Sequence, residues 1–104
     1  MTELDRYEIL LPLKFNDGRM VPRELLAQTR TELKERFGAI SAESQVIRGE
    51  DEETGCHGDQ LTRVFVDVPA TEENRLFFRK LKERLKERFA QFEIFITVHS
   101  VRRL

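Results

Sequence analysis

Alternation of apolar and polar residues constrains the fold of this chain more than any other feature. Every odd position from Tyr7 to Phe15 is apolar, which predicts a strand with one buried face. The segments 61–68 and 93–101 alternate in the same way, and 44–49 predicts a weaker, shorter strand. The residues Asn16-Asp17-Gly18 predict a turn after the first strand. The sequence therefore predicts four strands.

Two further segments carry apolar residues at helical spacing. The first begins near Pro22, which suits a first helical turn, and stops at Gly38, a good terminator. Its inner face carries Leu26, Thr29, Leu33 and Phe37. Thr71 is the expected N-cap of the second helix, which runs to about Ala90. Its inner side carries Asn74, Phe78, Leu81, Leu85 and Phe89. The order β-α-β-β-α-β predicts a ferredoxin-like two-layer α+β sandwich, with an antiparallel sheet ordered 4-1-3-2 and both helices on one face.

Length and composition limit the classes of protein that this chain can belong to. The 104 residues predict one domain over 1–104, with an acidic hairpin tip at about 50–60 between the second and third strands. A net charge of −1 gives no overall electrostatic attraction to a nucleic acid or an anionic membrane. The chain has a single cysteine, no signal peptide at its start and no apolar run of membrane-spanning length. We therefore expect a cytoplasmic protein.

The predicted topology leaves one face of the sheet without helices. The more apolar face of each strand should form the core, with Ile9, Leu11, Leu13, Val64, Val66, Ile94, Ile96 and Val98. Leu10, Phe65 and Phe95 then lie together on the uncovered face, where a contiguous apolar patch is typical of an interface. Arg63 and Thr97 belong to the same face. We expect association there, with a second copy in a homodimer or with another protein partner; scattered surface apolarity is the alternative.

The polar residues of the uncovered face suggest a second function. Glu8, Asp67 and His99 are predicted to converge at one rim, because the first strand runs antiparallel to the third and fourth. A carboxylate beside a histidine could support proton transfer at a small-molecule site. No nucleophile or oxyanion donor completes a mechanism, so three solvated polar residues without a joint role are the competing interpretation.

Other candidate motifs carry less weight. Cys56-His57 lies in the acidic tip, but no second Cys or His pair accompanies it, so neither a metal nor a cofactor is expected. The second helix is locally basic, which is typical of a solvated helix face. The segment 63–68 echoes part of the motif of RNA-binding sheets, yet Leu10 and Pro12 stand where a stacking aromatic would be needed. Nucleic-acid binding is therefore disfavoured.

The segments 7–18, 63–69 and 73–78 resemble a family of small bacterial α+β proteins of unknown function. The resemblance covers most of the chain. It implies the same ferredoxin-like fold, and it brings no assigned activity and no functional residues.

Overall fold

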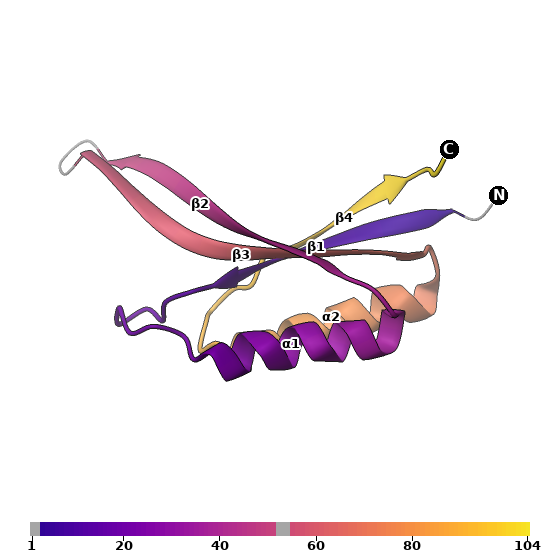
Figure 1. Ribbon diagram of the computed structural model, residues 1–104, viewed down its shortest axis with the longest axis horizontal. Coiled ribbons are helices and arrows are strands. Elements are labelled where there is room, and N and C mark those ends of the chain that lie inside the picture. Colours follow the sequence, from indigo (N-terminus) through magenta and orange to yellow (C-terminus); the bar gives the residue numbers. More distant parts are fainter. Residues whose placement is uncertain (1–2, 52–54) are drawn as a thin grey trace.

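The computed structural model describes the backbone of residues 3–51 and 55–104 and the side chains of residues 3–43 and 61–104. The elements in order are β1 (Leu4–Pro12), α1 (Arg23–Phe37), β2 (Ser41–Asp51), β3 (Gly55–Pro69), α2 (Glu72–Arg88) and β4 (Ile96–Val101). The sheet is antiparallel with the order β2-β3-β1-β4. Both helices cover one of its faces, and the β2–β3 hairpin extends beyond them (Figure 1). The predicted ferredoxin-like α+β sandwich is confirmed.

The helix boundaries follow the capping signals in the sequence. Gly38 ends α1 with a φ of 86°, which L side chains rarely adopt, and its N–H donates to the carbonyl of Lys34 at 2.7 Å. Thr71 caps α2, where its hydroxyl accepts the N–H of Asn74 at 3.2 Å. These two signals place both helices within a few residues of where the sequence predicts them.

The core lies between the helices and the alternate residues of the central strands. Its fully buried side chains include Ile9, Leu11, Leu33, Val64, Leu81, Leu85 and Phe89. An aromatic cluster joins the layers: the ring of Tyr7 stacks on Phe78 with centroids 3.8 Å apart, and the ring of Phe37 from α1 stacks on Phe78 with centroids 5.5 Å apart. This stacking fixes the position of both helices over β1.

The strands differ in length from the sequence-based prediction. The first begins three residues earlier, at Leu4, and ends at Pro12, so Leu13 and Phe15 follow it as partly buried residues. The hairpin strands continue to Asp51 and from Gly55, although the sequence predicts a tip at 50–60. The ladder between β2 and β3 therefore continues as far as the pair Asp51 and Gly55.

Val98 is the one predicted core residue that the structure leaves exposed. Its exposed fraction is 53%, whereas its neighbour Ile96 packs against the core. It lies on the helix-facing side of β4, because it pairs with the inward-facing Tyr7. Since β4 is an edge strand, its outer residues reach past the helix layer, and the prediction of Val98 as a core residue is wrong.

The described helices are all too short or too polar to cross a membrane.

Candidate functional site on the open sheet face

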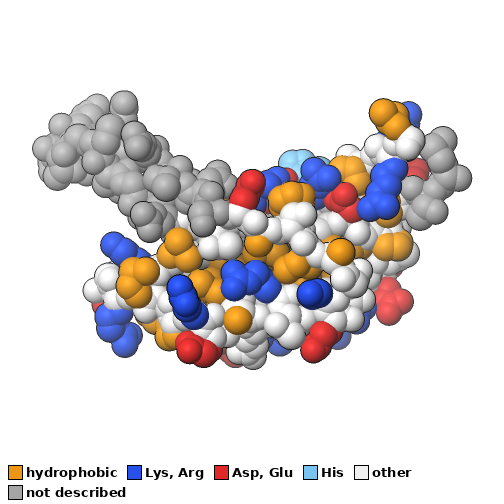
Figure 2. All heavy atoms as spheres, in the orientation of Figure 1, with side chains coloured by type: hydrophobic (Ala, Val, Ile, Leu, Met, Phe, Trp, Pro, Cys, Tyr) orange, Lys and Arg blue, Asp and Glu red, His pale blue; other side chains and the backbone are white. Residues whose placement is uncertain are grey.

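The helix-free face of the sheet carries ordered rows of side chains. The strand register places Arg6 between Asp67 of β3 and His99 of β4. In the next row, Glu8 lies between Phe65 and Thr97. Figure 2 shows acidic and basic side chains with a histidine along this side of the molecule. The face is therefore mainly charged at its centre, with the apolar residues beside the charges.

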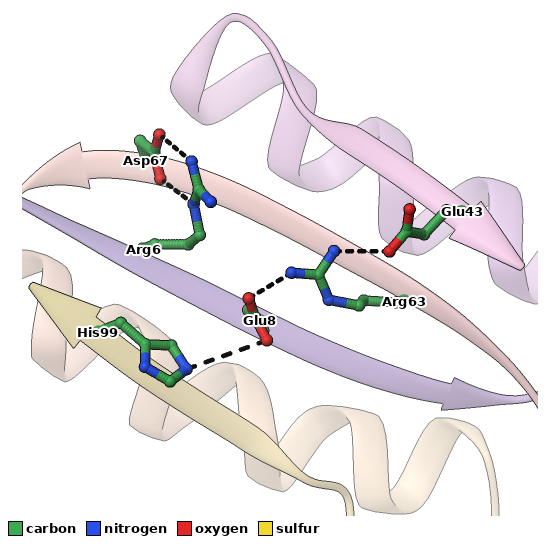
Figure 3. A network of polar contacts seen from close by, with 6 residues as sticks. All are labelled: Arg6, Glu8, Glu43, Arg63, Asp67 and His99. Atoms are coloured by element: carbon green, nitrogen blue, oxygen red, sulfur yellow. Dashed lines mark hydrogen bonds and ion pairs between the residues drawn. The ribbon is translucent and has the colours of Figure 1, made fainter. Parts of the chain in front are cut away.

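Arg6 and Asp67 form a two-pronged ion pair on this face (Figure 3). The Nε and Nη2 atoms of Arg6 donate to the two carboxylate oxygens of Asp67 at 2.8 and 3.0 Å. The pair is partly buried, and the hydrogen bond from Arg6 holds the pKa of Asp67 below its ordinary value. Asp67 is thus an ionised acceptor whose oxygens are already occupied.

Arg63 joins two carboxylates from the neighbouring strands (Figure 3). One of its amino groups donates to Glu8 of β1, and the other donates to Glu43 of β2 at 2.7 Å. The side chains of Arg63 and Glu8 are only 19% and 22% exposed. The hydrogen bond from Arg63 lowers the pKa of Glu8, against an opposing effect of burial. Glu8 is therefore held as a carboxylate at the centre of the network.

His99 approaches the same carboxylate from β4. Its Nε2 atom lies 4.0 Å from an oxygen of Glu8, and its side chain is 58% exposed. The sequence predicts that Glu8, Asp67 and His99 converge; the structure brings Glu8 and His99 near each other and places Asp67 on Arg6 instead. A proton on His99 would interact favourably with Glu8, while Asp67 belongs to a separate ion pair on the same face.

The three apolar residues predicted for this face have different surroundings. The guanidinium carbons of Arg6 and Arg63 lie 5.1 and 4.3 Å from the centre of the Phe65 ring, so this ring is flanked by cations. The N–H of Leu10 donates to the carbonyl of Phe95 at 3.1 Å, which places these two residues side by side. Phe95 is 64% exposed. Of these three residues, Phe95, just before β4, is the one whose side chain is mostly exposed.

Two other features of the sequence analysis lie apart from the network. The strand predicted to begin at Glu93 begins instead at Ile96, and Glu93 forms an ion pair with Lys82 of α2 at 2.9 Å. Cys56 and His57 fall among the residues whose side chains are not described, so the expectation that they bind no metal stays a prediction. Among the described side chains, His, Cys, Asp and Glu form no group of three or more suited to a metal ion.

Arg6 and Glu43 are members of the network that sequence reasoning missed. Arg6 stands one residue before the predicted start of the first strand, and Glu43 one residue before the predicted second strand. Continuing the alternation backwards from Glu8 would have placed Arg6 on the open face. For Glu43 only the strand register supplies the signal, since it pairs with Arg63 across β2 and β3.

Comparison with known proteins identifies the fold. No family model and no curated sequence matches the chain, so the resemblance to a bacterial family stays a prediction. A phage SAM lyase in complex with S-methyl-5'-thioadenosine is similar in structure, with a TM-score of 0.64 and 15% identity over 96% of this chain and 90% of that chain. Its apo state gives a TM-score of 0.58 and 14% identity over 95% and 80%. A Bacillus cereus protein related to NIF3 has a TM-score of 0.60 and 11% identity. The match covers 98% of this chain and 26% of the Bacillus cereus chain.

Proposed function

We propose that this chain acts by association and pairs with a second copy of itself through the open sheet face. The observation that carries the proposal is Phe95, which is 64% exposed beside Leu10 on a face without helices. A large aromatic residue in that position is the kind of anchor that dominates the binding energy of protein interfaces.

The charge network supports a second copy as the occupant. Arg6 and Glu8 occupy neighbouring open-face positions of β1, and Arg63 and Asp67 lie on either side of Phe65 on β3. A copy related by a two-fold axis presents the same residues, so a face that carries charges of both signs can be complementary to itself. The carboxylates and guanidiniums are already paired within the chain, so covering them leaves no lone buried charge.

The test compares two exposed apolar residues by light scattering over a concentration series. Phe95→Ser should weaken self-association at least about tenfold, which corresponds to about 1.4 kcal/mol. Leu76→Ser is the matched control, because Leu76 is 48% exposed on α2, on the helix side of the sheet. An unchanged association constant in Phe95→Ser, or an equal loss in both variants, would contradict the proposed interface.

A second candidate is a small-molecule site around Glu8, Asp67 and His99. Two observations favour it: His99 lies 4.0 Å from Glu8, and a structure of similar fold, a phage SAM lyase, holds S-methyl-5'-thioadenosine. Glu8 could accept a proton or a hydrogen bond from a ligand, while Arg63 holds the Glu8 carboxylate in position. Titration with S-methyl-5'-thioadenosine, followed by NMR, tests this site. Binding that His99→Asn weakens would support it, whereas an absence of saturable shifts would count against it.

A further inference from the structure

A hollow lies on the helix-bearing side of the sheet, opposite the open face. It has a volume of about 460 Å³ and lies between α2 and the edge strand β4. Its apolar wall includes Phe78, Ile96 and the half-exposed Val98. This volume falls within the range of roughly 300–1,000 Å³ that is typical of small-molecule sites.

Tyr7, which lines this hollow, carries a buried polar atom without a described partner. Tyr7 is 4% exposed, and no hydrogen-bond partner for its hydroxyl occurs among the residues that the structure describes. Leaving such a hydroxyl unsatisfied is costly, and an unpaired buried group calls for an explanation such as a bound ligand. Burial raises the pKa of this hydroxyl, and the nearby Asp5 adds to the effect, so it remains a proton donor.

The rim of the hollow is basic. Arg75, Arg79 and Lys82 line it, at the spacing that places them on one face of α2. Arg75 already approaches Glu72 at 3.2 Å, and Lys82 approaches Glu93 at 2.9 Å. Arg79 has no ion-pair partner within the described part of the chain, which makes it the cation available to an incoming anion.

We propose that this hollow is a binding site for a small organic anion with an apolar body. The anionic group would take hydrogen bonds from Arg79 and from the hydroxyl of Tyr7. Its apolar part would pack on Ile96 and on Val98, which is 53% exposed on the helix-facing side of β4. Asp5, which is 7% exposed and also lines the hollow, would accept a hydrogen bond from a ligand hydroxyl or amino group.

The site is separate from the proposed interface. Its lining residues on β1 and β4 are Asp5, Tyr7, Ile96, Val98 and Ser100, whose side chains point to the helix side of the sheet. Residues of the open face alternate with them along both strands. Failure of either proposal therefore leaves the other unaffected.

The test titrates the protein with hexanoate, hexyl sulfate and hexyl phosphate, with acetate as the probe that lacks an apolar body. Tyr7 is the only tyrosine and the chain has no tryptophan, so the long-wavelength band of the ultraviolet difference spectrum, where phenylalanine does not absorb, reports on Tyr7. We expect at least one of hexanoate, hexyl sulfate and hexyl phosphate to bind saturably, to perturb the Tyr7 spectrum and to bind more tightly than acetate.

Matched variants decide whether binding uses the proposed groups. Arg79→Gln should weaken the binding of that anion about tenfold, the range expected for a lost hydrogen bond to a charged group. Lys80→Gln removes the same charge from the neighbouring exposed position, which does not line the hollow, and should change affinity less than twofold, a shift of about 0.4 kcal/mol. Tyr7→Phe, followed by calorimetry, should also weaken binding. Absence of saturable binding by hexanoate, hexyl sulfate and hexyl phosphate would overturn the proposal. Equal losses of affinity in Arg79→Gln and Lys80→Gln would overturn it as well.

Discussion

Glu8 occupies the centre of the open face because strands on both sides of β1 contribute a partner to it. Arg63 donates to one of its oxygens and His99 lies 4.0 Å from the other. Glu8 thereby joins residues that are distant in sequence, and its ionisation stabilises the register of three strands. The same holds for Asp67, whose partner Arg6 lies 61 positions away.

This arrangement predicts acid sensitivity. The pKa values of Glu8 and Asp67 lie below their ordinary values of 4.5 and 3.8 in the folded chain. The unfolded chain therefore binds more protons in this range, and the stability that the two carboxylates contribute is lost as the pH falls below those ordinary values. Urea unfolding across pH should show a shallower acid loss of stability in Glu8→Gln and in Asp67→Asn. Acid profiles that match the unsubstituted protein in both variants would contradict the ion pairs.

The hydroxyl of Tyr7 leads to a prediction of opposite direction. Tyr7→Phe keeps the stacking on Phe78 and removes a buried group that lacks a described partner. Without ligand, we expect the free energy of unfolding to rise by about 1 kcal/mol, the lower end of the cost of an unsatisfied buried group. Tyr7→Leu, which loses the stacking, should lower it. Chemical denaturation measures both variants, and a destabilised Tyr7→Phe would show that the hydroxyl is satisfied in solution.

The sequence predicts which residues face outward, yet it does not fix how they pair. The alternation correctly places Glu8, Asp67 and His99 on the open face. Which residues become partners depends on the register, that is, on how one strand is aligned along its neighbour. A single sequence does not reveal this alignment. Arg6 separates Asp67 from His99 for this reason, and it lay outside the predicted first strand.

At the level of elements, capping signals are more informative than strand ends. Pro22, Gly38 and Thr71 predict the helix boundaries correctly because each acts on the backbone next to it. The ends of β2 and β3 depend instead on pairing between two segments, and the late start of β4 follows from the connection that carries Glu93 toward α2. Helix caps can be predicted from the sequence because they depend on neighbouring residues. Strand ends cannot, because they depend on pairing between segments that are distant in the sequence.

The N-cap of α2 can be tested by itself. Thr71→Ala removes the acceptor of the Asn74 N–H and should lower the free energy of unfolding by about 1 kcal/mol. Thr31→Ala is the control, because Thr31 is exposed inside α1, where alanine is the better helix former. Thermal unfolding distinguishes the two variants. Equal stability in Thr71→Ala and the unsubstituted protein would mean that this hydroxyl does not cap the helix.

At the level of the whole molecule, the sheet separates two surfaces with different chemistry. The open face carries paired charges around Phe65 and an exposed Phe95, which suits a self-complementary interface. The helix-bearing side carries a basic hollow beside β4. A dimer formed through the open face would leave the hollow accessible in both copies, so the protein could associate and bind a small anion at the same time.

The proposed pairing of two copies through the open face can be tested by detecting contacts between the copies. A sample that mixes isotope-labelled and unlabelled chains allows NMR to detect only nuclear Overhauser effects that cross between copies. We predict such effects from the Phe95 ring to open-face side chains of the other copy, including Leu10. A monomeric protein without intermolecular nuclear Overhauser effects would contradict the proposed interface. Effects between the helices of the two copies in place of the open faces would contradict it as well.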